Sequence, residues 1–167
     1  MEVIARWESQ RGKRYRMKGY LTPTSGHSLP LQETTMGNRA VIACGKHPKD
    51  LGIYLHWNGG PESVLAFVRA AKDLGMREPD KNGDQSYGMA RLTQIIANFF
   101  GGSTSIGIGT LDQLDCDNGD NGVYYLHPGY TLRRANNSTV TCPKDQQERM
   151  EGIYQDCMEK NKSHVKE

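Results

Sequence analysis

The hydrophobic pattern of the chain changes its period at Gly59-Gly60-Pro61. Before this point, residues 51–57 (LGIYLHW) carry the β-branched and aromatic side chains typical of a strand. Pro61 suits the first turn of a helix, where its missing N–H is not needed, and Gly75 is typical of a helix end. Between them the apolar residues recur at helical spacing: Val64, Leu65, Phe67, Val68, Ala71 and Leu74. A strand therefore passes directly into a helix through two glycines.

The same reasoning predicts the other elements. Strands are expected at 39–44, 104–110 and 122–126, and further helices at 87–100 and about 144–160. The strands at 39–44 and 51–57 are separated by a short polar turn, so we expect them to form a hairpin. The broad apolar surface of the helix at 87–100 predicts deep burial. This order of elements predicts an α+β fold, with a mostly antiparallel sheet packed by about three helices.

The first 37 residues differ from the rest of the chain. Two short strand-like runs at 2–8 and 14–21 surround a turn, and residues 22–37 are rich in Thr, Ser, Pro and Gly without any period. We expect residues 1–37 to form a basic N-terminal hairpin and linker. Residues 38–167 are expected to form the compact α+β domain.

Composition narrows the class of protein. Of 167 residues, 36% are apolar and 24% are charged, which is typical of a globular chain rather than a disordered one. No apolar run approaches the length needed to cross a membrane, and the N-terminus lacks the basic and apolar regions of a secretory signal. We therefore expect a cytosolic protein with no membrane partner.

Charge is small in total but unevenly distributed. The net charge of +2 is low for a protein built around nucleic-acid binding. Residues 1–20 hold six basic side chains against two acidic ones, and Arg11, Lys13 and Arg14 are candidate partner contacts among them. Residues 111–122 hold Asp112, Asp115, Asp117 and Asp120 with no basic residue. Both surfaces can be solvated, or one of them can dock on a partner of opposite charge.

The strand–helix junction is a candidate binding site formed by His56, Trp57, Asn58, Gly59 and Gly60. Backbone N–H groups at the start of a helix suit an anion or a phosphate, and an exposed tryptophan can stack on a base. The alternative interpretation is structural: the glycines form a tight turn, Trp57 anchors the core, and His56 contacts a backbone carbonyl. Glu62 would repel a phosphate bound here.

The acidic segment 111–122 permits several interpretations. Its acids do not follow the EF-hand pattern, because Gly119 and Asp120 stand where an oxygen ligand and a glycine are required. Tight turns explain the Asn and Gly residues equally well, because both tolerate a positive φ. Two functional possibilities remain. The four aspartates can bind a divalent cation, or they can mimic a phosphate backbone and bind a basic partner surface.

Other metal and catalytic motifs are weak. Cys44-Gly45-Lys46-His47 has the spacing of half a zinc site, but a second pair of ligands would have to come from scattered cysteines, and Cys157 fits a helix core better. The chain has neither a G-x-S-x-G nor an H-E-x-x-H motif. We therefore expect no cofactor and no enzyme activity, with a hydrolase that uses His56 and a metal as a less favoured alternative.

Four motifs within residues 37–126 carry a resemblance. They are YLHWNGG at 54–60, YGMARL at 87–92, ANFFGG at 97–102 and LDCDNGDNG at 114–122. On these motifs the chain resembles a family of small, mostly uncharacterised proteins carried on phages and mobile elements of Firmicutes and related gut bacteria. Separately, VIARWES at 3–9 is similar to the opening of other short phage-borne proteins.

The resemblance implies a biological context rather than residue roles. Small proteins of mobile elements without enzyme motifs often counter host defence, and anti-CRISPR proteins are a common class of this kind. We therefore expect an inhibitor that binds an RNA-guided nuclease in the cytoplasm of a bacterial host and blocks its binding or cleavage of nucleic acid. The alternatives are a protein that binds a nucleotide signal at residues 56–62, and a nucleotide or nucleic-acid hydrolase.

Overall fold

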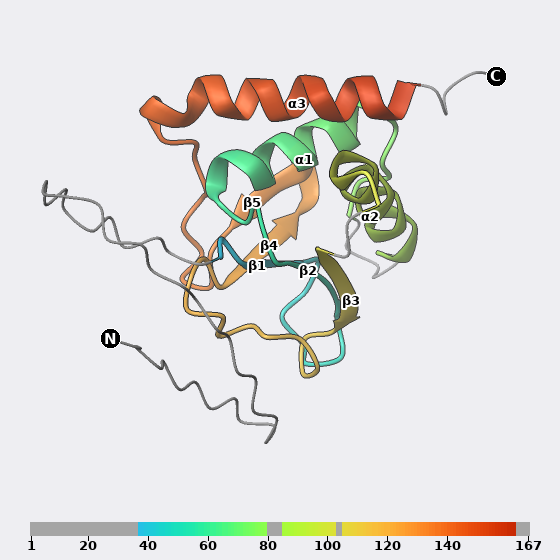
Figure 1. Cartoon of the computed structure of the whole chain (residues 1–167). Coiled ribbons are helices and arrows are strands. Elements are labelled where there is room, and N and C mark those ends of the chain that lie inside the picture. The colour runs from blue at the N-terminus through green and yellow to red at the C-terminus, as the bar shows by residue number, and fades with distance from the viewer. Residues whose placement is uncertain (1–36, 80–84, 103–104, 163–167) are drawn as a thin grey trace, which may run out of the picture. The chain divides into compact units, whose positions relative to one another are not determined.

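The computed structural model describes residues 37–79, 85–102 and 105–162, all within the unit formed by Thr35–Glu167 (Figure 1). The predicted N-terminal hairpin and linker, with Arg11, Lys13 and Arg14, lies outside the described residues except for Gly37. The strands are β1 (Ala40–Ala43), β2 (Leu51–Leu55), β3 (Ile106–Thr110), β4 (Val123–His127) and β5 (Thr131–Arg133). The helices are α1 (Pro61–Asp73), α2 (Ser86–Phe100) and α3 (Gln147–Lys162), with 3₁₀ turns at Pro128–Tyr130 and Lys144–Gln146.

The strands form one mixed sheet in the order β3-β2-β1-β4-β5. β1 and β2 are the predicted antiparallel hairpin, in which Ile42 lies opposite Ile53. β2–β3 and β4–β5 are also antiparallel, whereas β1 and β4 run parallel, with Val41 opposite Val123. The prediction of an α+β fold with a mostly antiparallel sheet and three helices is therefore confirmed.

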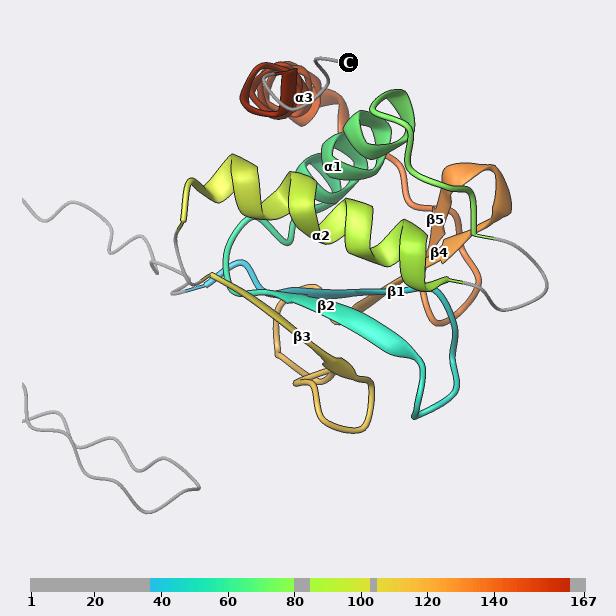
Figure 2. The same cartoon turned by 90° about the vertical axis from the view of Figure 1, so that its right-hand side faces the viewer.

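All three helices lie on the same side of the sheet. α1 and α2 lie over the strands, and α3 crosses above α1 as an outer layer (Figures 1 and 2). The layers meet through fully buried side chains: Ile42, Ile53 and Leu55 from the sheet, Phe67 from α1, Leu92, Ile95 and Ile96 from α2, and Cys157 from α3. The prediction that Cys157 belongs to the core of a helix layer is confirmed.

The opposite side of the sheet is covered in part by the acidic segment 111–122. A Cβ atom at Gly52 would lie 2.8 Å from Leu114 Cδ1 and 3.2 Å from Leu111 Cδ2, so these two leucines pack directly on the β2 backbone. Gly109 on β3 likewise leaves room for Leu114. The acidic segment is thus anchored on the sheet through its two leucines and exposes its acids around them.

Two expectations need correction. The short strand β5 was not predicted, because three residues are too few to show an alternating pattern. α2 was expected to be deeply buried, but it buries one face only: Tyr87 is 61% exposed, and Phe99 and Phe100 are half-buried. α2 packs against α1, α3 and β2, and its opposite side lies at the front of the molecule in Figure 2 with no other described element over it, so its apolar surface is only partly covered.

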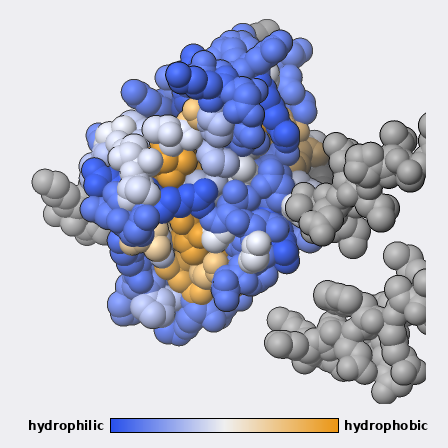
Figure 3. Space-filling view, turned by 90° about the vertical axis from the view of Figure 1, so that its left-hand side faces the viewer, coloured by the Kyte–Doolittle hydropathy of each residue, from blue (hydrophilic) through white to orange (hydrophobic). Residues whose placement is uncertain are grey.

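The surface seen from the left of Figure 1 is mostly hydrophilic and carries a narrow apolar strip near its middle (Figure 3). Among the described helices, none combines the length and the apolar composition needed to cross a lipid bilayer.

Candidate functional site

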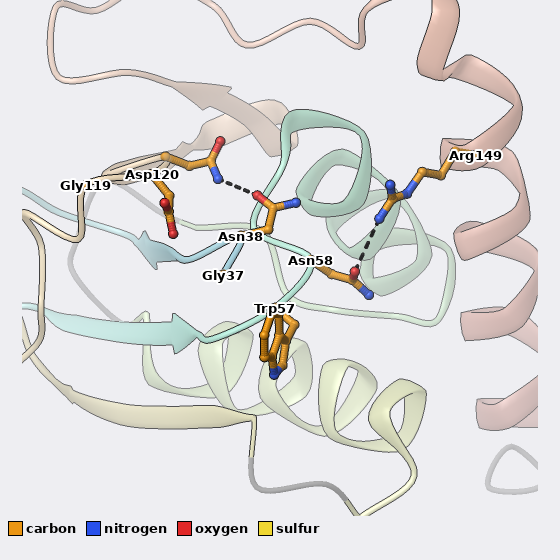
Figure 4. Close-up of a pocket in the computed structure, with 8 residues that line it drawn as sticks. Gly37, Asn38, Trp57, Asn58, Gly119, Asp120 and Arg149 are labelled. Atoms are coloured by element: carbon orange, nitrogen blue, oxygen red, sulfur yellow. Dashed lines mark hydrogen bonds between the residues drawn. The ribbon is translucent and has the colours of Figure 1, made fainter. Parts of the chain in front are cut away.

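A cleft of about 610 Å³ opens where four separate segments of the chain meet (Figure 4). One wall is the chain entering β1, and a second is the β2–α1 junction. The third is the end of the acidic segment, and the fourth is the first turn of α3. The lining residues are Gly37, Asn38, Trp57, Asn58, Gly119, Asp120, Asn121 and Arg149. The cleft therefore joins part of each candidate site: Trp57 and Asn58 from the junction, and Asp120 from the four aspartates. The other predicted residues of the described chain do not line it: His56, Gly59, Gly60, Asp112, Asp115 and Asp117.

Trp57 projects from the junction with 46% of its surface exposed. The His56 ring packs nearly perpendicular to it, with ring centroids 4.8 Å apart, and His56 is itself exposed. The core-anchor interpretation of Trp57 is therefore wrong: β2 ends at Leu55, and the chain leaves the sheet before the tryptophan can enter the helix layer. The interpretation that His56 contacts a backbone carbonyl is wrong as well. Its ring nitrogen lies 3.4 Å from the Tyr54 hydroxyl, and no backbone carbonyl in the described ranges contacts it.

The backbone at the junction is rigid. Asn58 adopts a left-handed conformation with φ of 56°, which asparagine tolerates better than most residues. The next N–H, of Gly59, donates a hydrogen bond of 2.6 Å to the carbonyl of Asn38, and the Tyr124 hydroxyl donates to the Gly59 carbonyl at 2.9 Å. A Cβ atom at Gly59 would lie 2.5 Å from the Asn38 carbonyl oxygen, so this position requires glycine. Gly59 thus has a structural role, but it is close packing against the chain entering β1 rather than a tight turn: the positive φ at this junction belongs to Asn58, and Gly60 is extended.

The start of α1 already carries a negative charge. Gly60 caps the helix without a side-chain bond, and the carboxylate of Glu62 folds back against it, 2.4 Å from where a Gly60 Cβ would stand. Glu62 is only 3% exposed, and the Ser63 hydroxyl donates to it at 3.1 Å. The positive end of the helix dipole stabilises this carboxylate. A phosphate at the junction would meet it at close range.

Arg149 of α3 faces the same carboxylate from the cleft side. Its Nε lies 3.6 Å from Glu62 Oε1, and its Nη2 lies 3.5 Å from the Asn58 side-chain oxygen. The guanidinium side chain remains 57% exposed, so most of its donors face solvent. The sequence did not indicate Arg149, because a basic residue on the polar face of an amphipathic helix carries no signal of its own.

Two of the four candidate aspartates are bound within the chain. Asp120 accepts hydrogen bonds from Arg39 through the guanidinium Nε at 2.7 Å and the backbone N–H at 3.0 Å. Asp112 accepts from Lys49 at 2.5 Å and from the Thr110 hydroxyl. These hydrogen bonds lower the pKa of both carboxyl groups. Asp112 and Asp120 therefore already have a cationic partner within the chain, whereas their predicted role in partner binding stays a prediction.

Asp115 and Asp117 are exposed, and neither has an ion-pair partner in the described parts of the chain. The buried Asn118 shapes the loop between them and β4. Its amide group donates to the carbonyls of Asp115 and Gly122, and its oxygen accepts from the N–H groups of Asp120 and Gly122. Gly119 and Gly122 have φ of 74° and 60°, which confirms the predicted turns.

Metal binding finds little support in the geometry. The described residues contain no group of three or more His, Cys, Asp and Glu side chains placed to hold a metal ion. Burial raises the pKa of Cys44 to about 12, which disfavours the thiolate that zinc requires. The cleft is therefore best suited to contacts by an aromatic ring, a guanidinium and amide groups.

Comparisons with protein-family models, with curated proteins and with solved structures found no match to this chain. The geometry of the cleft and of the acidic segment therefore carries the functional argument.

Proposed function

We propose that this protein is an anti-defence inhibitor that binds an RNA-guided nuclease in the bacterial cytoplasm and blocks its contact with nucleic acid. The observation that carries the proposal is the exposed Trp57, held on a rigid junction beside the Arg149 guanidinium and the acidic segment. The family resemblance of residues 37–126 supplies the context of a mobile element.

The cleft has the composition of an interface hot spot. Tryptophan and arginine dominate the energetics of protein interfaces, above all where they surround a pocket that a partner can fill. Trp57 loses little conformational freedom on binding, because the Gly59–Asn38 and Tyr124–Gly59 hydrogen bonds already fix the backbone beside it. The partner contacts we propose are therefore Trp57, Asn58 and Arg149.

The unpaired acids supply charge complementarity. Asp115 and Asp117 are exposed on the acidic segment, whose end lines the cleft, and neither forms an ion pair among the described residues. An RNA-guided nuclease holds its nucleic acid in a positively charged channel, and two carboxylates on a rigid loop can take the place of phosphates there. Of the four aspartates expected to steer binding, we assign this role to Asp115 and Asp117.

The nucleotide-binding alternative is less favoured by the geometry. The exposed Trp57 is available for stacking, but the Glu62 carboxylate lies at the helix start where a phosphate would bind. The hydrolase alternative needs a metal, and no described cluster of ligands accompanies His56.

The test is cleavage of target DNA by a panel of purified nucleases loaded with guide RNA, titrated with the full chain. We expect Trp57→Ala to raise the concentration for half-inhibition about 30-fold, the effect of losing one hot-spot residue. Tyr87→Ala is the matched control, because Tyr87 is also an exposed aromatic but lies on α2 away from the cleft. Its half-inhibition should stay close to that of the unmodified protein.

The acids are tested through the association rate. We expect Asp115→Asn combined with Asp117→Asn to slow association at low salt, and the difference to vanish as salt rises. Asp156→Asn with Glu159→Gln, two exposed acids of α3, is the control for total charge. No inhibition of any nuclease, with a melting-temperature rise on addition of nucleotides instead, would replace the proposal with the nucleotide-binding alternative.

A further inference from the structure

The two edge strands of the sheet differ in whether another described segment pairs with their outer side. Beside β5, the chain returns and pairs with it: Arg133 forms a bridge with Thr139, and the Val140 N–H donates to the Leu132 carbonyl at 2.9 Å. β3, at the other edge, pairs with β2 on its inner side, and no described segment pairs with its outer side. This strand lies at the right of the sheet in Figure 1 and on the near side in Figure 2.

The hydrogen bonds at both ends of the β2–β3 ladder show which backbone groups face outward. The His56 N–H donates to the Ser105 carbonyl, and the Leu111 N–H donates to the Asp50 carbonyl. Hydrogen-bonded and non-hydrogen-bonded pairs alternate in an antiparallel ladder, so Gly107 and Gly109 face β2. The N–H and C=O groups of Ile106 and Ile108 therefore point to the open edge.

Within the part of the chain that the structure describes, the outer side of β3 lacks the features that usually protect an edge strand. Natural edges carry charges, prolines or bulges, or are covered. β3 reads Ile-Gly-Ile-Gly-Thr, with no charged residue and no proline. Ile108 is 62% exposed. Leu51 pairs with Thr110, which lies on the same face of β3 as Ile108, and Leu51 is 39% exposed. Unpaired backbone groups and exposed apolar side chains thus occur together at this edge.

We infer that β3 pairs with β3 of a second copy of this chain, antiparallel about a two-fold axis at Gly107. In this register Ile106 of one copy lies opposite Ile108 of the other, and each of these pairs exchanges both backbone hydrogen bonds. The two Gly107 residues face each other at the axis. The two sheets then form one continuous sheet, with the helices of both copies on the same side.

A second copy fits because the strand is complementary to itself. The sequence Ile106-Gly107-Ile108 reads the same in both directions, so the two-fold places isoleucine against isoleucine. Such cross-strand β-branched pairs stabilise a sheet, and the absence of charges removes the like-charge repulsion that a two-fold would otherwise create. The absence of side chains on Gly107 lets the two strands approach at the axis. Pairing over so few residues predicts a dimer that dissociates on dilution.

The first experiment is sedimentation velocity of the full chain across the micromolar range. We expect a concentration-dependent dimer that is lost in Ile108→Pro. Proline lacks the N–H that faces the open edge and replaces an exposed side chain, but it removes no hydrogen bond to β2 and is therefore compatible with the fold. Ile108→Val is the matched control, because it keeps the N–H and should keep the dimer. A protein that stays monomeric throughout, or a dimer that persists in a folded Ile108→Pro variant, would overturn the inference.

The second experiment tests the register and does not depend on the proline variant. A non-hydrogen-bonded pair places its Cα atoms about 4.5 Å apart, within the range of a disulfide. A Cβ at Gly107 makes only ordinary contact with Tyr54, so Gly107→Cys should fold and form a covalent dimer under mild oxidation. Ile108→Cys is the control, because its two copies lie beyond about 7 Å on the diagonal and should not crosslink. Crosslinking is measured above that of the unmodified chain, whose free cysteines can themselves react. Equal crosslinking of the two variants above that level would contradict the proposed register. If the chain stays monomeric and a different protein binds at β3, the inference is wrong and the edge pairs with a strand of that other protein.

Discussion

Gly59→Ala offers the sharpest test of how the chain presents its cleft. A Cβ at this position would lie 2.5 Å from the Asn38 carbonyl oxygen, 2.7 Å from the Ala40 Cβ and 2.7 Å from the Arg39 carbonyl carbon. These neighbours belong to the backbone around β1 and to a buried alanine, so no side chain can rotate away. The junction must separate from β1 to admit one methyl group.

The cost follows from two contributions. Overpacking of a tightly packed site costs about 1–3 kcal/mol. Moving the junction away from β1 also breaks the Gly59–Asn38 and Tyr124–Gly59 hydrogen bonds, each worth about 0.5–1.5 kcal/mol. The free energy of unfolding should therefore fall by about 2–6 kcal/mol, which lowers the melting temperature of a unit of this size by roughly 7–20 °C.

Two matched glycines serve as controls in the same thermal and urea denaturation assays. The atoms nearest to a Cβ at Gly60 belong to the Glu62 side chain rather than to backbone, so a side-chain rotation can relieve the contact and Gly60→Ala should cost less than Gly59→Ala. Gly152 lies in α3 with nothing within 4 Å, so Gly152→Ala should stabilise the helix by about 0.5–1 kcal/mol. If Gly59→Ala melts within about 2 °C of the unmodified protein, the argument that β1 fixes the junction is refuted.

Two further predictions concern titratable groups. Hydrogen bonds from Arg39 lower the pKa of Asp120 in the folded state, so its ion pair stabilises the fold above the unfolded pKa of about 3.9 and is lost as pH falls through the folded value. Asp120→Asn should therefore have a lower urea midpoint than the unmodified protein at neutral pH, and the two should converge in acid; a constant gap down to the acid limit would contradict this. Burial raises the pKa of Cys157 to about 12, so iodoacetamide at mildly alkaline pH should label the half-buried Cys142 more than about tenfold faster than Cys157, as read by mass spectrometry. Equal labelling rates in the folded protein would show that α3 opens readily.

Local sequence patterns were enough to locate most of the elements. The apolar spacing after Pro61 predicted α1, and the run Met150, Ile153, Tyr154, Cys157 and Met158 predicted α3. These patterns work because a helix face or a strand face must be apolar wherever it meets a core, whatever its partner is. The positive φ values of Gly119 and Gly122 were predictable for a similar local reason, since the conformational preference belongs to the residue.

The candidate site depended on contacts that local patterns do not encode. The acidic segment gave no sign that Asp120 pairs with Arg39, 81 residues away, because such a pair exists only when β1 and β4 are adjacent. Arg149 reaches the cleft because α3 crosses above α1. Trp57 is exposed because β2 ends two residues before it, a boundary set by the length of the strands with which β2 pairs.

The sequence by itself thus determined which segments are helices and strands, where the chain turns, and which class of fold they form. The tertiary structure decided the parallel pairing of β1 with β4, which acids stay unpaired, and which aromatic side chain faces solvent. The physical reason is range: periodicity and turn preference act over a few residues, whereas burial and ion pairing depend on neighbours that only the packed sheet and helices bring together.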